Sequence, residues 1–313
     1  MPLHPQAQNF LAMVAGAPPL DMMTAEECRA GLRAALPLTG APSALAEVTD
    51  TTLPSPAGAV PVRVYRPSNA AQLPVVAYFH GGGWIMGDLD SHDTTCRDIA
   101  RYAEAVVVAV HYRRPPEHPF PAAYEDCLAV TKALLDGSAG LGTDRNRVAV
   151  AGDSAGGNMA ASIAQALRGS SPGLVHQVLI YPLTDARLTQ TASYRQFAEG
   201  HFLTRRDIEH CLKTYAGAAD REDVRLSPAL AKDLSGLPAA TVITAECDPV
   251  RDDGEAYAAA LRTASVPVEY WCFEGQVHPF VMLGGIIDAA HEARRLMGER
   301  LRQSFASDTP SDE

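Results

Sequence analysis

The sequence has few cysteines, and none of them forms a C-x-x-C pair. Six cysteines are dispersed over the 313 residues. They are Cys28, Cys96, Cys127, Cys211, Cys247 and Cys272. In a long chain, dispersed cysteines are typical of a reduced intracellular protein in which the thiols are small buried hydrophobic groups. The pattern therefore argues against a disulfide framework.

Positive charge and long hydrophobic runs are also scarce. Asp and Glu outnumber Lys and Arg by 37 to 26, for a formal net charge of −11. This disfavours a nucleic-acid or anionic-membrane partner, because such partners bind basic patches. No segment approaches the roughly 18 apolar residues of a membrane-spanning helix. The apolar patch in residues 1–20 has no Lys or Arg before it, unlike a signal peptide. We therefore expect a soluble, cytoplasmic protein.

From residue 60 onward, the chain alternates short β-rich runs with helix-length segments. The runs cover residues 60–65, 75–79, 105–112, 147–152, 177–182, 240–246 and 268–273. Several are apolar throughout, as expected for parallel strands that are covered on both faces. The helical segments include residues 122–135, 155–168, 252–263 and 286–305. The alternation predicts an α/β fold with an open, mostly parallel sheet of about eight strands.

Two segments fall outside this alternation. Residues 1–46 contain helical pieces broken by prolines, with no strand signal. Residues of about 184–219 are helical and polar, and we interpret them as an insertion between strands. Ligands of open α/β sheets bind beyond the carboxyl ends of the strands, so the candidate functional residues are sought there.

The run at 147–151 leads into GDSAGG at 152–157, which contains a G-x-S-x-G motif between a strand and a helix. Small residues must flank the serine in such a tight turn, which exposes the Ser154 hydroxyl above the sheet. The alternative is a glycine-rich turn that only joins strand to helix. A serine hydroxyl is a weak nucleophile, so the catalytic interpretation requires a base and an acid that orients it.

Chain order and position select the base and the acid. In this type of fold the order is Ser, then Asp or Glu, then His. Five histidines follow the serine, namely His176, His201, His210, His278 and His291. His278 is favoured because it lies in a short loop after the last strand. Asp248 follows the preceding strand directly and is the favoured acid, with Glu246 as its rival. Asp252 and Asp253 look like residues of the first turn of a helix, where negative charge suits the helix dipole.

Three consecutive glycines, Gly81 to Gly83, follow the run at 75–79 and His80. Hydrolysis of a carbonyl compound needs donors for the developing oxyanion. One donor would be the backbone N–H of Ala155, and the others should come from a loop after an earlier strand. Glycines allow the backbone to approach the substrate oxygen closely. The alternative is a flexible surface turn.

These motifs resemble the hormone-sensitive-lipase-like esterases, family IV of the α/β hydrolases. The matching pieces are HGGGW (80–84), YRRPPEHPFPAAYED (112–126), GDSAGGN (152–158), YP (181–182), DPVRDDGEAYA (248–258) and HPF (278–280). With Asp153 directly before the serine, the motif resembles that of the family's GDSAG subgroup. The family's usual Leu-Ala is replaced by Arg114-Pro115, a departure that we expect to affect local packing rather than catalysis.

The resemblance implies an α/β-hydrolase fold and hydrolysis of short- to medium-chain carboxylic esters through an acyl-enzyme. Ser154 would be the nucleophile, His278 the base and then the acid, and Asp248 its orienter. Gly82, Gly83 and Ala155 would supply the oxyanion N–H groups. Residues 1–46 and about 184–219 would form a helical cap on a catalytic domain spanning 47–313. The resemblance further implies a small-molecule ester as substrate, no metal or organic cofactor, and a homodimer formed through an edge of the sheet.

The residues that would line the substrate pocket are less distinctive. The candidates for substrate contact are Trp84, Asp153, Tyr181, Phe202, Leu203 and Phe280. Apolar residues of this kind are more often part of a core.

Two other functions use a related fold: a non-catalytic small-molecule receptor, and an amidase or deacetylase with the same triad. The receptor is disfavoured because plant receptors of this type lack the triad histidine, whereas His278 is present.

Overall fold

The structure is a computed structural model that describes residues 2–189 and 191–307. Eight strands of this part form one sheet in the order β1-β2-β4-β3-β5-β6-β7-β8. The strands are β1 Glu47–Ser55, β2 Gly58–Arg66, β3 Val75–Phe79, β4 Val106–Val110, β5 Val148–Asp153, β6 Leu174–Ile180, β7 Ala239–Cys247 and β8 Val268–Val277. β2 runs antiparallel to both β1 and β4, and the other neighbours pair in parallel. The predicted mostly parallel sheet of about eight strands is confirmed.

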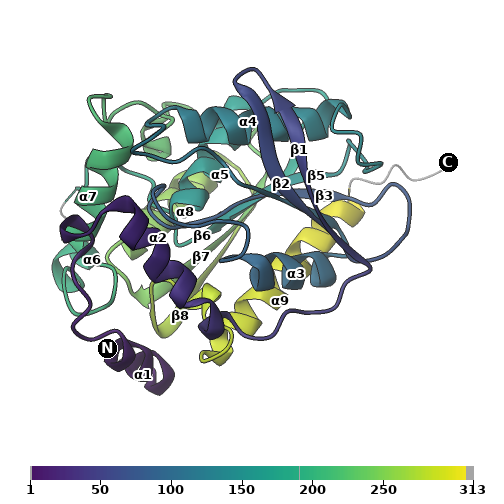
Figure 1. The fold of residues 1–313 in the computed structure, drawn as a ribbon. Helices are drawn as coiled ribbons and strands as arrows, with labels where there is room; N and C mark the ends of the chain where they lie inside the picture. The colour runs from purple at the N-terminus through teal and green to yellow at the C-terminus, as the bar shows by residue number, and fades with distance from the viewer. Residues whose placement is uncertain (1, 190, 308–313) are drawn as a thin grey trace.

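Helices cover both faces of this sheet (Figure 1). They are α3 Asp93–Ala103, α4 Ala122–Asp136, α5 Ala155–Ala166, α8 Arg251–Thr263 and α9 Asp288–Ser307. α3 and α9 pack side by side on one face, and α4, α5 and α8 lie on the other. Every residue of β3, β4 and β5 is buried as a result. This burial explains why those strands, apart from Asp153 at the end of β5, carry apolar residues on both faces rather than alternating.

The predicted helices at 122–135, 155–168, 252–263 and 286–305 are present, with ends that differ by at most two residues.

Two elements were not predicted, namely β1 and α3. Most of β1 is exposed, and Leu53 is its single buried residue, so it lacks a hydrophobic run. α3 is amphipathic, but its buried face carries Thr94, Thr95 and Asp98 beside apolar residues. Because these buried residues are polar, apolar residues do not recur at the spacing that identifies a helix in a sequence.

The two segments predicted to form a cap lie together, beyond the carboxyl ends of the parallel strands (Figure 1). The first carries α1 Pro5–Met13 and α2 Ala25–Ala34, and the second carries α6 Ala192–Gln196 and α7 Arg205–Ala216. The Leu20 N–H donates to Asp207 at 3.0 Å, and Arg206 pairs with Asp21 at 2.8 Å. Segments almost 190 residues apart are thus joined by a hydrogen bond and an ion pair. The division of the chain at residue 46 stays a prediction.

β1 and β8 are the edges of the sheet. β8 carries the half-exposed Trp271, but a homodimer through this edge stays a prediction. None of the described helices combines the length and the apolar composition needed to cross a membrane.

Candidate active site

The tight turn between β5 and α5 places Ser154 at the carboxyl edge of the sheet. Ser154 has φ +56° and ψ −116°, a region that side-chain-bearing residues adopt only under strain. A Cβ on Gly156 would overlap the carbonyl oxygen of Phe79, and a Cβ on Gly152 would overlap the backbone of Gly156. The glycines of G-x-S-x-G are therefore required because strand and helix approach each other closely at this turn.

The structure brings Ser154, His278 and Asp248 into one hydrogen-bonded chain. His278 Nε2 lies 3.0 Å from Ser154 Oγ, and His278 Nδ1 lies 2.8 Å from Asp248 Oδ2. Asp248 is fully buried, and its Oδ1 accepts the Val250 N–H at 3.0 Å. The Tyr181 ring packs against the imidazole, with centroids 4.3 Å apart. An imidazole held in this way can take a proton from the serine while its other nitrogen donates to the carboxylate.

The rival acids of the sequence are engaged elsewhere. Glu246 accepts the Gly275 N–H at 2.8 Å. Asp252 accepts the N–H of Ser193 at 2.8 Å and lies in the first turn of α8, as predicted. Among the described acidic residues, Asp248 alone is hydrogen-bonded to His278.

Asp253 is buried and interacts electrostatically with Asp248. Burial, reinforced by the charge of Asp185, raises the pKa of Asp253 to about 8. Its carboxyl group is therefore mostly protonated at pH 7, and its Oδ2 accepts a hydrogen bond from the Tyr194 hydroxyl at 3.4 Å.

The other candidate histidines lie outside this chain of contacts. His176 is buried between Thr241 and Ser304. His201 contacts the Glu199 carbonyl, and His291 contacts the Gly284 carbonyl. Within the described part of the chain, His278 is the histidine within hydrogen-bonding distance of Ser154, as the sequence predicted.

The loop after β3 presents the predicted glycines. Gly82 has φ +104° and Gly83 has φ +59°, conformations that glycine adopts without strain. A Cβ on Gly82 would lie 2.8 Å from the Met86 carbonyl carbon, and one on Gly83 would overlap Cys211 Sγ on α7. In residues 2–189 and 191–307, no acceptor receives the N–H of Gly82, Gly83 or Ala155. Their role as donors to an oxyanion stays a prediction.

Residues 76–282 match the family model of the alpha/beta hydrolase fold. The chain belongs to this family. The resemblance to the hormone-sensitive-lipase-like hydrolases is thereby confirmed.

Relatives and solved structures agree with this assignment. The chain is 45% identical over 240 residues to the carboxylesterase NlhH of Mycobacterium tuberculosis, covering 75% of each chain. It is 33% identical over 311 residues to an arylesterase of Saccharolobus solfataricus, covering 97% of this chain and all of that one. The structure of an ester hydrolase from the Lake Arreo metagenome superposes with a TM-score of 0.92 at 37% identity, covering 97% of this chain and 99% of that one.

The remaining pocket candidates of this hydrolase occupy different surroundings. Trp84 is buried and stacks on Tyr215 of α7, with ring centroids 4.7 Å apart. Phe280 is buried with its ring 6.0 Å from that of Tyr181, which itself contacts His278. Phe202 is 43% exposed and packs on Phe10 of α1 at 5.1 Å. Tyr181 is therefore the candidate directly beside the histidine.

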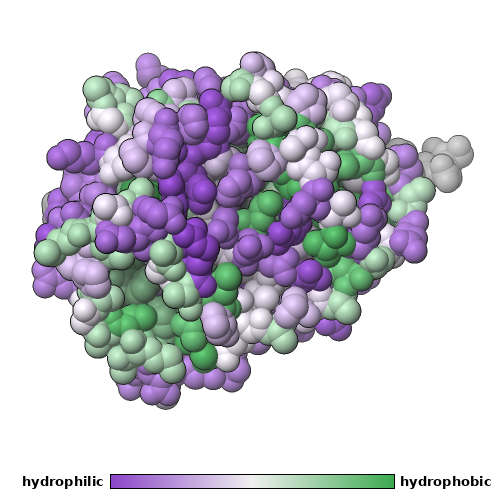
Figure 2. Space-filling view, viewed as in Figure 1, coloured by the Kyte–Doolittle hydropathy of each residue, from purple (hydrophilic) through white to green (hydrophobic). Residues whose placement is uncertain are grey.

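Leu203 follows Phe202 and is half-buried against the core. Hydrophobic residues gather around a hollow over the region of α1, α2 and α6 (Figure 2). Substrate contact by Trp84, Tyr181, Phe202, Leu203 and Phe280 stays a prediction.

Asp153 points into the interior rather than toward a substrate site. Its carboxylate accepts from the Tyr78 hydroxyl at 2.8 Å and from the Gly81 N–H at 3.0 Å, and it lies 3.1 Å from His92 Nε2. A substrate contact by Asp153 has no support in these partners. Sequence reasoning did not single out Tyr78 or His92, because neither lies in a motif that suggests a partnership with Asp153.

His80 organises the loop that carries the glycines. Its ring stacks on Tyr112 with centroids 4.1 Å apart, and the Tyr112 hydroxyl donates to the His80 carbonyl at 2.7 Å. Burial, with a smaller contribution from His92, holds the pKa of His80 well below its usual value. A neutral, stacked ring suits a structural role better than proton transfer.

The unusual Arg114-Pro115 segment also contacts this loop. Arg114 donates to the Gly87 carbonyl. Arg29 of α2 donates to the Pro115 carbonyl at 2.9 Å and pairs with Glu117 at 2.8 Å. The departure from the family pattern therefore lies where the N-terminal segment packs on the glycine loop.

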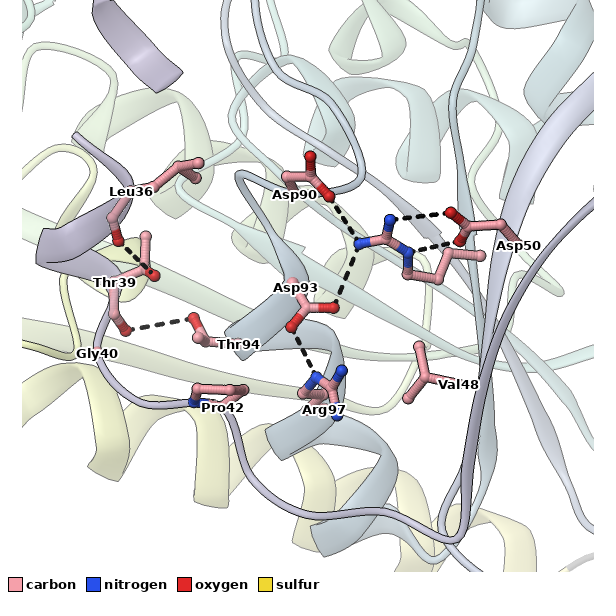
Figure 3. Close-up of a pocket in the computed structure, with 11 residues that line it drawn as sticks. Leu36, Thr39, Gly40, Pro42, Val48, Asp50, Asp90, Asp93, Thr94 and Arg97 are labelled. Atoms are coloured by element: carbon pink, nitrogen blue, oxygen red, sulfur yellow. Dashed lines mark hydrogen bonds and ion pairs between the residues drawn. The ribbon is translucent and has the colours of Figure 1, made fainter. Parts of the chain in front are cut away.

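A cavity of about 590 Å³ lies apart from Ser154. It is lined by Leu36, Thr39, Gly40, Pro42, Val48, Asp50, Arg63, Asp90, Asp93, Thr94 and Arg97 (Figure 3). Arg63 of β2 bonds Asp50 at 2.6 Å, Asp90 at 2.9 Å and Asp93 at 3.4 Å. These ion pairs fasten the start of α3 to the first two strands.

Proposed function

We propose that this carboxylic ester hydrolase cleaves short- to medium-chain esters through an acyl-enzyme formed on Ser154. The observation that carries the proposal is the continuous hydrogen-bonded chain from Ser154 Oγ through both nitrogens of His278 to the buried Asp248. A serine, a base and an orienting acid in this arrangement are what nucleophilic attack on an ester carbonyl requires.

In the proposed mechanism, Ser154 Oγ attacks the carbonyl carbon while His278 Nε2 takes its proton. The N–H groups of Gly82, Gly83 and Ala155 stabilise the negative oxygen of the tetrahedral intermediate. His278 then gives the proton to the departing alcohol as the carbon–oxygen bond breaks. Water, deprotonated by the same imidazole, hydrolyses the acyl-enzyme and restores the serine.

The substrate class can be tested with matched chromogenic substrates. p-Nitrophenyl esters from acetyl to lauroyl are compared with p-nitroanilides of the same acyl groups. We expect kcat/KM to be highest for acyl chains of about two to eight carbons and far lower for every anilide. An anilide hydrolysed faster than its matched ester would identify an amidase instead. If no ester and no anilide is hydrolysed, the receptor function is favoured.

The assignment of the acid is tested by a pair of isosteric variants. Asp248→Asn should lower kcat by about 10⁴-fold, because the amide cannot hold the imidazole in the required tautomer. Glu246→Gln should leave kcat nearly unchanged, because Glu246 bonds the Gly275 N–H and not His278. Steady-state kinetics on p-nitrophenyl butyrate measures both variants. The reverse order of damage would assign the acid to Glu246.

A further inference from the structure

A buried carboxylate joins the serine turn to the glycine loop. Asp153, which directly precedes Ser154, is 1% exposed. Its Oδ1 accepts the Gly81 N–H at 3.0 Å and the Tyr78 hydroxyl at 2.8 Å. A Cβ on Gly81 would overlap the carboxylate, so the two segments are in closest contact here. This contact sets the spacing between the nucleophile and the glycine loop.

His92 completes the surroundings of this carboxylate. Its Nε2 lies 3.1 Å from Asp153 Oδ1, and its Nδ1 lies 2.8 Å from Ser91 Oγ. Burial opposes ionisation of Asp153, but His92, together with Tyr78 and Gly81, outweighs it and holds the pKa of Asp153 below its usual value. The Gly81 N–H lies 3.3 Å from His92 Nε2 and 3.0 Å from Asp153 Oδ1. A charged carboxylate is an acceptor only, so the Gly81 N–H donates to Asp153, and Nε2 of His92 carries a hydrogen that it donates to the same carboxylate.

The position of His92 is itself fixed from outside the site. His92 is the residue immediately before α3, and the next residue, Asp93, bonds Arg63 at 3.4 Å and Arg97 at 2.6 Å. Figure 3 shows the Asp93 carboxylate joined by dashed lines to two guanidinium groups, one of which is that of Arg97. Ser91 is held in turn by the backbone of Asp88, which donates to its hydroxyl at 2.9 Å. The bonds of its two neighbours, Ser91 and Asp93, therefore hold His92 in place beside Asp153.

We propose that His92 is a positioning residue for the oxyanion hole. By donating to Asp153, it keeps that carboxylate oriented to hold Gly81, and thereby sets Gly82 and Gly83 at the right distance from Ser154. A shift of about 1 Å in such donors can cost on the order of 100-fold in rate. The inference rests on the proposed ester hydrolysis, because it concerns the donors of that reaction.

The test compares His92→Phe with His92→Gln. Phenylalanine keeps a buried aromatic ring but removes the N–H, whereas glutamine keeps a side-chain N–H donor. The matched control is His176→Phe, because His176 is equally buried but bonds Thr241 and Ser304 instead. For each protein, kcat and KM on p-nitrophenyl butyrate, Tm, and the Ki of a trifluoromethyl ketone are measured. This ketone forms a tetrahedral adduct with a serine nucleophile, and the adduct's oxyanion needs the same donors.

We expect His92→Phe to lower kcat by about 10- to 100-fold and to weaken inhibition by the ketone to a similar extent, with little change in KM. His92→Gln should recover much of both losses. His176→Phe should change Tm but neither kcat nor Ki. A folded His92→Phe protein with normal kcat and normal Ki overturns the inference, since a structural role alone would change only Tm.

A second variant covers the case in which His92→Phe does not fold. Ser91→Ala removes the partner of the other ring nitrogen and should lower kcat and weaken ketone inhibition in parallel, by a smaller factor. If His92→Phe is unfolded and Ser91→Ala leaves both values unchanged, the inference is also overturned. Absence of ester hydrolysis by the wild type would instead contradict the proposed function, so the two failures are distinguishable.

Discussion

Replacing Ser154 by alanine should give a folded protein that hydrolyses p-nitrophenyl butyrate about 10⁴- to 10⁶-fold more slowly than the wild type. The variant removes the atom that attacks the carbonyl and leaves His278, Asp248 and the glycine loop in place. Residual turnover would come from water attacking a substrate bound beside the oxyanion donors. Purified wild type and variant are compared under identical conditions, with Tm as the check on folding.

Ser162 provides a matched control for this variant. It is buried on α5, the helix that follows Ser154, and its hydroxyl donates to the Met159 carbonyl at 3.1 Å. Ser162→Ala should therefore retain near-normal kcat. An active Ser154→Ala protein would remove the serine from the mechanism, and equal losses in both variants would indicate damage to the helix rather than to the nucleophile.

His278→Ala should lower kcat by about 10⁴- to 10⁶-fold, because Ser154 then has no base and the leaving alcohol has no acid. The loss arises from proton transfer, since Ser154 and the oxyanion donors remain. Steady-state kinetics on p-nitrophenyl butyrate measures the loss, with Tm as the check on folding.

His291→Ala is the control for the base. His291 is exposed, and its ring bonds the Gly284 carbonyl at 2.8 Å, so its loss should leave kcat unchanged. Near-normal turnover by a folded His278→Ala protein would require another histidine to act as the base.

The three residues of the proposed catalytic chain could be predicted from the sequence because each is tied to a strand end. Ser154 follows β5, Asp248 follows β7 and His278 follows β8. In a parallel sheet these ends lie at one edge, so residues far apart in sequence meet there. Position relative to the strands thus identified contacts that span as many as 124 residues.

The reason for the three glycines could be predicted only in part. The sequence suggested that missing side chains make room for a substrate oxygen. The structure instead gives each glycine a contact within the protein, with Asp153 at Gly81, Met86 at Gly82 and Cys211 at Gly83. The contacts with Asp153 and Cys211 depend on the tertiary packing of β5 and α7, which no local pattern specifies.

The network of Asp153 and His92 could not be predicted for the same reason. Its members lie 61 residues apart. A single histidine before a helix belongs to no sequence motif that predicts a carboxylate partner. β1 was missed because an exposed edge strand has no hydrophobic run. Sequence patterns identify buried strands and strand-end motifs well, and they do not identify polar contacts between elements.

The most direct test of the account is covalent labelling with a fluorophosphonate, followed by peptide mapping. This reagent phosphonylates an activated serine with loss of fluoride. The account predicts one label per chain, on the peptide that contains Ser154, with esterase activity lost in proportion to labelling and no label on Ser154→Ala. Labelling of a different serine, or full activity in a fully labelled protein, would contradict it.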